Sequence, residues 1–313
     1  MQKIIRMNST QVLFFTLGAY FDTRLLKYLF FLILLCLYVL IVGSNVLLIV
    51  VICVNRSLHE PMYMFLCSLF VNELYGSTGL FPFLLVQILS DVHIVSAPLC
   101  FLQIFCLYTY ATVEFFILAV MSYDRYVAIC HPLRYNTLMR TQKIAGLTSA
   151  SWLAAFLLVV IMTSLSFSLQ LCGNVINKVY CNNFSIVKLS CSDTTVNNIY
   201  GLISTALSVF VPVALILYTY MRILKVCFSG SKQTRQKAVN TCTPHLASLV
   251  NFCAGCVFEI IQSRFNMSSV PRLFQILLSL YFLTCPPLFN PAVYGLNVSK
   301  IRSVCKNLFL KSH

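Results

Sequence analysis

The sequence predicts an all-α membrane protein built as a seven-transmembrane helix bundle, and three observations lead to this fold class. Of the 313 residues, 59% are hydrophobic and only 10% are charged. The mean hydropathy is +0.86, which the surface of a water-soluble domain does not tolerate. Seven apolar stretches are long enough to cross a bilayer, which takes about 20 residues. Backbone groups in hydrocarbon must be bonded within their own segment, so these stretches are expected to be helices.

The predicted spans follow one another with short loops between them, at residues 28–54, 62–89, 98–122, 144–168, 196–227, 239–262 and 273–296. The first is too long for the apolar region of a cleavable signal. The third ends where Asp124 and Arg125 meet water, and the sixth follows the basic residues Lys232, Arg235 and Lys237. The seventh contains Pro291, which removes a helix hydrogen bond and supplies a bend. We therefore expect a tail over 1–27, one helical domain over 28–296, and a second tail with a short amphipathic helix over 297–313.

The basic residues predict the orientation in the membrane. The face that holds loops one, three and five and the C-terminus has 14 of the 22 Lys and Arg residues. Arg24 and Lys27, beside the first span, favour the opposite orientation weakly. Positive charge collects on the cytoplasmic side, so we expect an extracellular N-terminus in the plasma membrane. The sequon at Asn8 then lies outside and predicts glycosylation. The net charge of +14 indicates anionic lipid and a protein partner, not nucleic acid.

Four of the 15 cysteines are expected on the outer, oxidising side. Cys100 lies at the outer end of the third span, and Cys172, Cys181 and Cys191 lie in the loop between the fourth and fifth spans. An even number in one place indicates two disulfides. Four cysteines permit three pairings, which the residues alone leave open.

Several motifs in a fixed order resemble one family of receptors. "MSYDRYVAICHPLRY" at 121–135 resembles the MAYDRYVAIC signature of vertebrate olfactory receptors, which are rhodopsin-like (class A) G-protein-coupled receptors. The other matching motifs are "GSN" (43–45), "LHEPMYMFL" (58–66), the cysteine-containing stretch 172–194, Tyr218 to Tyr220, "KAVNTCTPHL" (237–246) and "PPLFNPAVYG" (286–295). The resemblance covers about 90% of the chain by these motifs. It implies a rhodopsin-like bundle that binds an odorant and raises cyclic AMP through a stimulatory G protein of the olfactory type.

The resemblance also implies how the cysteines pair and how the inner end works. It pairs Cys100 with Cys181 and Cys172 with Cys191, which holds the outer loop as a lid. In the resting state Asp124 holds Arg125, because an arginine at the membrane boundary is costly unless paired. The alternative is that both are solvated interface residues. The residues implied in G-protein coupling and switching are Asp124, Arg125, Tyr126, Tyr220, His245, Asn290, Pro291 and Tyr294.

Two acids lie deep in the apolar runs. Glu73 in the second span and Glu114 in the third are functional candidates, since intramembrane carboxylates are costly. Their matching depth suits a sodium ion with Asn45 and Asn290 nearby, which resembles what is proposed for this family. The alternative is that one or both are protonated and only hydrogen-bonded. Apart from this ion we expect no cofactor.

The implied odorant pocket opens outward between the third, fifth, sixth and seventh spans. Residues at helical spacing are expected to line it: Leu107, Tyr108, Ala111, Thr112, Ser204, Thr205, Ser208, Cys256, Ile260 and Arg264. Arg264 occupies the position where the fish-like class I subset has an arginine that binds a ligand carboxylate, so a small carboxylic acid is expected. If Glu259 also reaches the cavity, an amino acid, which carries an ammonium group, is a further candidate. The alternative for Arg264 is a helix-end residue that snorkels to the interface.

The same residues support other functions less well than they support a receptor. The five histidines are scattered and no catalytic set is visible, so we predict no enzyme. The seventh span lacks the lysine that a retinal Schiff base needs. An ion channel or transporter is the alternative, because intramembrane acids also mark ion paths. Neither an internal repeat nor a broken-helix pair supports it.

Overall fold

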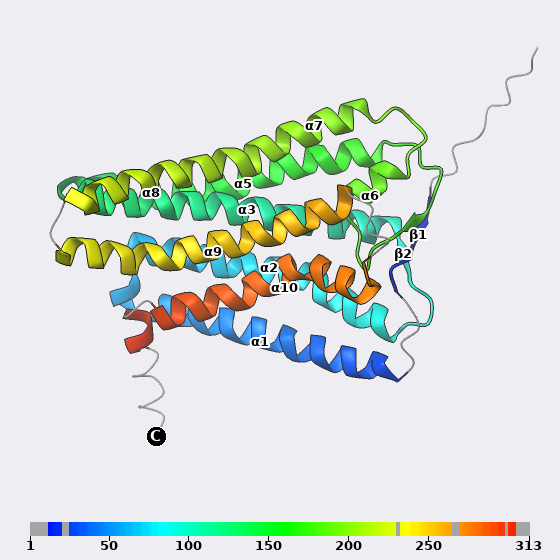
Figure 1. Ribbon diagram of the computed structural model, residues 1–313, viewed down its shortest axis with the longest axis horizontal. Coiled ribbons are helices and arrows are strands. Elements are labelled where there is room, and N and C mark those ends of the chain that lie inside the picture. The colour runs from blue at the N-terminus through cyan, green and yellow to red at the C-terminus, as the bar shows by residue number, and fades with distance from the viewer. Residues whose placement is uncertain (1–11, 21–24, 230–231, 265–269, 298–299, 305–313) are drawn as a thin grey trace, which may run out of the picture.

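The computed structural model describes residues 12–20, 25–229, 232–264, 270–297 and 300–304. Its long helices run alongside one another as one bundle (Figure 1). Within the described residues, seven helical segments are long and apolar enough to cross a membrane. The predicted fold class is therefore confirmed.

The spans end close to where the sequence places them. They are α1 (Leu26–Val54), α2 (Pro61–Leu89), α3 (Ala97–Cys130), α5 (Thr141–Phe167), α7 (Thr195–Thr205) continued by η3 (Ala206–Phe210) and α8 (Val211–Ser229), α9 (Lys232–Arg264), and α10 (Arg272–Asn297). α2 begins at Pro61, where a missing N–H costs nothing because first-turn donors have no helical partner. α3 continues to Cys130, past residue 122 where its apolar run ends. Asp124 and Arg125 are therefore held on a helix.

The fifth span contains a π-helical turn that the sequence analysis did not predict. In η3 the Val211 N–H donates to the Ala206 carbonyl, five residues back instead of four. Pro212, which follows at once, has no N–H to donate to the Ser208 carbonyl, so the regular pattern is already interrupted there. Such a turn shifts the side chains that follow it around the helix, and it is frequent at functional sites. It lies in the wall of the cavity described below.

α3 is the central helix of the bundle. Of the 18 consecutive residues that are most apolar in α3, 61% are buried, whereas only 17% of the corresponding residues of α5 are buried. Polar side chains gather inside, with Asn45, Asn72 and Asn290 all buried, while leucines and valines of α1, α5 and α8 are exposed. This arrangement is the one that a bilayer favours, because lipid is as apolar as the exposed side chains.

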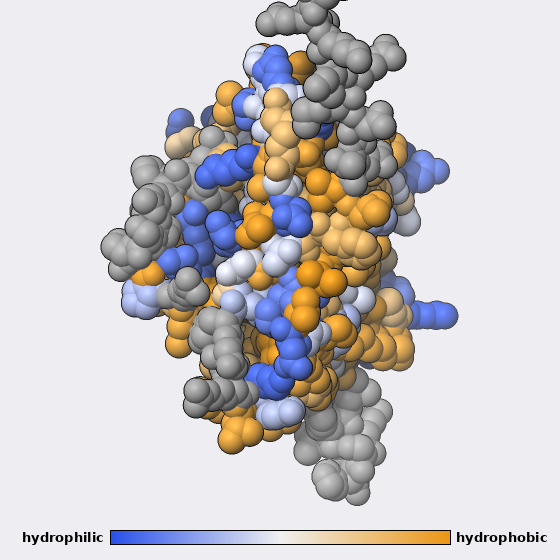
Figure 2. Space-filling view, turned by 90° about the vertical axis from the view of Figure 1, so that its right-hand side faces the viewer, coloured by the Kyte–Doolittle hydropathy of each residue, from blue (hydrophilic) through white to orange (hydrophobic). Residues whose placement is uncertain are grey.

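A small sheet lies at the outer end of the bundle, and the sequence analysis did not foresee it. β1 (Phe14–Leu17) pairs antiparallel with β2 (Ile94–Ser96) and parallel with β3 (Val175–Ile176). Figure 2 views the end that carries the sheet, where hydrophilic side chains lie among hydrophobic ones. The sheet ties part of the N-terminal tail to the loop between α5 and α7.

Short helices complete the loops on both sides. They are η1 (Arg56–Leu58), η2 (Pro132–Arg134) and α4 (Tyr135–Leu138) at the inner end, and α6 (Asn183–Lys188) in the second outer loop. Residues 300–304 are also helical, within the tail where a short helix is expected. Asn8 lies outside the described residues.

Candidate functional site

The second outer loop is held over the bundle by two disulfides. Cys100 at the start of α3 is bonded to Cys181, with 5.4 Å between their Cα atoms. Cys172 is bonded to Cys191 within the loop, at a Cα distance of 5.6 Å. These are the pairings that the resemblance implies. The backbone N–H of Cys181 also donates to Gln103 Oε1 at 2.8 Å, which fixes the loop where it passes over α3.

A cavity of about 250 Å³ lies under this loop, slightly below the roughly 300–1,000 Å³ of sites that hold drug-sized ligands, so it fits only a small molecule. Nine residues predicted to line the ligand pocket line this cavity: Leu107, Tyr108, Ala111, Thr112, Ser204, Thr205, Ser208, Cys256 and Ile260. They come from α3, the fifth span and α9, as their helical spacing predicts. The side chain of Arg264, the last residue of α9, lies outside the part of the chain that the structure describes.

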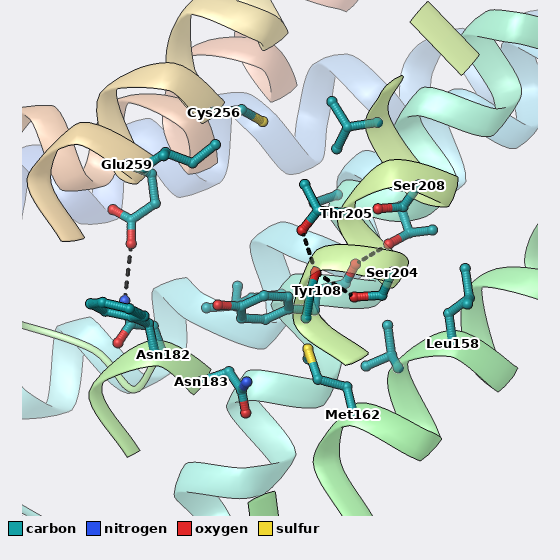
Figure 3. A pocket seen from close by; sticks show the side chains of 18 of the residues that line it. Tyr108, Leu158, Met162, Asn182, Asn183, Ser204, Thr205, Ser208, Cys256 and Glu259 are labelled. Atoms are coloured by element: carbon teal, nitrogen blue, oxygen red, sulfur yellow. Dashed lines mark hydrogen bonds between the residues drawn. The ribbon is translucent and has the colours of Figure 1, made fainter. Parts of the chain in front are cut away.

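Two walls of the cavity consist of residues that were not predicted from the sequence. α5 contributes Leu158 and Met162, and the second outer loop contributes Asn182 and Asn183 (Figure 3). The two asparagines directly follow Cys181, which its disulfide anchors on α3. That position is the only signal in the sequence that could have placed them there. The α5 residues belong to a uniformly apolar run and carry no such signal.

An ion pair lies at the edge of the cavity. Glu259 on α9 lines the cavity and is paired with Lys178 of the outer loop. Asn182 Nδ2 donates to the same Glu259 oxygen at 3.1 Å, and Figure 3 shows the two side chains pointing toward one another. Lys178 is only 7% exposed, and this burial lowers its pKa while the Glu259 carboxylate opposes the shift. The sequence analysis considered Glu259 but not its partner from the loop.

A cluster of aromatic rings connects the cavity to the centre of the bundle. Phe115 and Phe282 line the cavity. Phe252 packs on Phe115 edge to face, at a ring distance of 4.9 Å, and lies 6.3 Å from Phe282. Tyr110 contacts Phe252 and Phe282 at 5.9 and 6.3 Å. A ligand that displaces Phe115 or Phe282 would therefore move rings that touch Tyr110.

Tyr110 is hydrogen-bonded to the network that holds the two intramembrane acids. Its hydroxyl donates to Glu73 Oε2 at 3.0 Å. Asn290 Nδ2 donates to one oxygen of Glu73 at 2.5 Å and to one of Glu114 at 3.0 Å. Asn72 Nδ2 donates to the other Glu114 oxygen at 3.0 Å. The two acids and Asn290 lie together as the sequence predicts, whereas Tyr110 and Asn72 were not predicted there.

Asn45, which was expected beside these acids, bonds elsewhere. Its Nδ2 donates to the Pro287 carbonyl at 2.9 Å. That carbonyl lies four residues before Pro291, which has no N–H to donate to it. Asn45 thus replaces the hydrogen bond that Pro291 removes, and it ties α1 to the bend of α10.

The charged pair at the inner end has the expected partners and one more. Asp124 is fully buried and forms an ion pair with Arg125, whose Nε donates to Asp124 Oδ2 at 2.9 Å. The hydroxyl of Tyr135 on α4 donates to Asp124 Oδ1 at 2.8 Å. Burial and the Asp124 carboxylate raise the pKa of the Tyr135 phenol, so it remains a donor at neutral pH. Tyr126 is bonded to His131 at 3.1 Å.

Three of the other predicted switch residues, Tyr220, His245 and Tyr294, are buried in the bundle. The Tyr294 hydroxyl on α10 lies 3.3 Å from His245 Nδ1 on α9. Asn290 and Pro291 lie elsewhere, at the two acids and at the bend of α10.

Within the described residues, no group of three or more His, Cys, Asp or Glu side chains has the geometry of a metal site. The sodium ion expected from the sequence would lie at Glu73 and Glu114, which are only two carboxylates and fall below that count.

Comparison with known proteins gives one consistent result. The family model described as "Olfactory receptor" matches residues 34–312 of the chain. The chain is 34% identical to Olfactory receptor 6E1 of Mus musculus over 299 residues, which is 95% of each chain. It is 33% identical to Olfactory receptor 10A3 of Homo sapiens, over 95% of this chain and 94% of the relative. Olfactory receptor 52N4 of Homo sapiens is 34% identical over 85% of this chain and 84% of its own.

Proposed function

The chain belongs to the olfactory receptor family, and from that premise we propose that it detects a small amino acid and activates a stimulatory G protein. The family is one of odorant-sensing, G-protein-coupled receptors and not of enzymes. This membership also removes the support for the alternative of a channel or transporter. The seven apolar helices make the chain a multi-pass membrane protein. We propose that it lies in the plasma membrane with its N-terminus on the extracellular side.

The Lys178–Glu259 pair carries the proposed ligand class. Glu259 on α9 lines the cavity, and Lys178 of the outer loop pairs with it from behind the cavity wall. A zwitterion offers each of them a partner, its ammonium for Glu259 and its carboxylate for Lys178. Both charges would stay compensated when the ligand enters, which a buried charge requires. A plain carboxylic acid would leave Glu259 facing a second negative charge.

Neutral groups along the cavity would hold the rest of the ligand. Tyr108, Thr112, Ser204 and Thr205 can donate or accept hydrogen bonds, while Leu107 and Met162 contact apolar atoms. The small volume, about 250 Å³, favours a short side chain. Arg264 remains the second candidate for the carboxylate, as in the class I subset.

A cyclic AMP reporter in cells that express the full chain tests the ligand class. The panel contains small amino acids, the carboxylic acids and amines that share their carbon skeletons, and neutral alcohols. We expect amino acids to be the most potent. Lys178→Met and Glu259→Gln should each lower that potency at least roughly 30-fold, since truncating one partner of a buried charge pair costs about 2 kcal/mol or more.

Matched controls separate this role from general effects. Lys188→Met removes an exposed lysine of the same loop, and Asp193→Asn removes an exposed acid; both should respond like the wild type. Potency for amino acids that survives both pair substitutions would exclude the pair from recognition. If Arg264→Ala removes responses to carboxylates and Lys178→Met does not, the carboxylate binds Arg264 instead.

We also propose that a sodium ion binds between Glu73 and Glu114. Two carboxylates that share one amide donor, Asn290, cannot both hold a full charge in an apolar interior without a compensating cation or proton. Replacing external sodium by N-methylglucamine should shift agonist potency of the wild type but not of Glu73→Gln. Equal shifts in both, or none in the wild type, would favour a shared proton.

A further inference from the structure

A second cavity of about 650 Å³ lies near the outer end, between α1, α2 and α10. Figure 1 shows these three helices running alongside one another. Among the residues that the structure describes, none lines both this cavity and the one under the disulfide-bonded loop. Neither the proposed ligand site nor the inner switch uses it. Its volume is within the range of sites for drug-sized molecules.

The walls show that this cavity opens sideways toward lipid. Ile33 on α1 and Leu277 on α10 both line it, and they are 46% and 57% exposed. Leu84 closes the inner wall from α2 and is buried. In a bilayer, the exposed edges of α1 and α10 face hydrocarbon. An apolar cavity does not hold water well, so its natural occupant enters from the membrane.

The outer end of the cavity is polar and has no net charge. Lys27 and Asp91 form an ion pair there at 2.9 Å, and Asp91 is 91% exposed. His93 stacks on Tyr20 at 4.3 Å, and burial lowers the pKa of its imidazole, which keeps it neutral. The Tyr20 hydroxyl is already bonded to the Val179 carbonyl at 3.0 Å. A bound anion or cation would have to compete with the Lys27–Asp91 pair.

We propose that this cavity binds an uncharged membrane amphiphile, with an apolar body between α1 and α10 and a hydroxyl head at Lys27, Asp91 and His93. A hydroxyl group can accept from the ammonium of Lys27 and donate to the carboxylate of Asp91 at once, without separating the pair. Sterols and long-chain alcohols share this chemistry. A sterol would come from the membrane itself, and a long-chain alcohol would come from outside as an odorant.

The test is equilibrium binding of tritiated cholesterol and of tritiated 1-dodecanol to the purified full-length receptor in phosphatidylcholine nanodiscs. Leu34→Trp fills the cavity from α1, where Leu34 is half-buried and lines it. Leu277→Trp fills it from α10, at a position exposed enough to need no repacking. Leu32→Trp is the matched control, since Leu32 is 55% exposed on α1 and does not line the cavity.

We expect saturable binding of at least one probe, weakened roughly tenfold or more by Leu34→Trp and by Leu277→Trp, and retained in Leu32→Trp. Binding of cholesterol alone assigns the membrane as the source, and binding of dodecanol alone assigns an external ligand. No saturable binding of either probe, or equal binding in all variants, overturns the proposal. If dodecanoate displaces the probe as well as dodecanol does, the uncharged head group is wrong.

Discussion

Replacing Tyr135 by phenylalanine should raise the activity of the receptor in the absence of ligand. In the structure the Asp124 carboxylate accepts from Arg125 Nε at 2.9 Å and from the hydroxyl of Tyr135 at 2.8 Å. Phenylalanine keeps the ring and removes only this donor. The Asp124 carboxylate then loses one of its hydrogen bonds, and the ion pair that keeps Arg125 in place is weakened.

The size of the effect follows from the strength of that bond. A hydrogen bond to a charged group contributes about 1.5–3 kcal/mol net, and the half-buried position of Tyr135 favours the lower end. About 1.4 kcal/mol is a factor of ten in an equilibrium. If an active minor state is populated at about 1%, the substitution raises this to about a tenth. Ligand-independent cyclic AMP should rise accordingly, about tenfold at equal surface expression.

A second tyrosine at the same end provides the control. The Tyr123 hydroxyl accepts from Lys143 at 3.1 Å, on the exposed side of α3 and away from Asp124. Tyr123→Phe should leave the basal signal unchanged. The reasoning is refuted if Tyr135→Phe behaves like Tyr123→Phe, or if it lowers the basal signal while surface expression is retained.

Three further outcomes are expected. Gly255→Ala should destabilise the receptor by up to about 2 kcal/mol, because a Cβ there would lie 2.5 Å from Phe282 Cβ and 2.8 Å from its Cα, and overpacking costs about 1–3 kcal/mol against a gain of about 1 kcal/mol in helix propensity. Gly201→Ala meets no atom within 4 Å and should stabilise it; thermal unfolding in detergent that ranks the two the other way contradicts the packing. Arg125→Ala should abolish ligand-stimulated cyclic AMP while antibody staining of the cell surface persists. Cys172→Ser should release the loop and lower ligand potency, an effect absent in Cys36→Ser, which alters an exposed free thiol; equal potency in the two variants would mean that the bridge does not shape the cavity.

The spans were predictable because their cause is local. Transfer of apolar side chains into lipid adds up along the chain, so a run of about 20 residues identifies itself without reference to any other. α1 and α2 accordingly begin and end within a few residues of the predicted limits. The helical spacing of Leu107, Tyr108, Ala111 and Thr112 likewise placed them on one face, because a helix fixes which residues share a side.

Other features depend on how the helices are rotated and packed, and no local rule contains that information. Lys178 reaches Glu259 only because the Cys100–Cys181 bridge brings the loop over α9. Asn45 was expected at the acids, but it bonds the carbonyl that Pro291 leaves free. The three-stranded sheet and the wall that α5 contributes also come from such contacts.

Composition, hydropathy and the order of the motifs were enough to predict a membrane bundle of seven helices, its family, and the residue types at its two ends and its centre. Only the packing of the helices and loops shows which side chains compensate one another, which rings connect the cavity under the outer loop to Glu73 and Glu114, and that a second cavity lies between α1 and α10. The reason is that hydrophobic transfer depends on composition, whereas charge pairing and cavities depend on distances between segments that lie far apart in the chain.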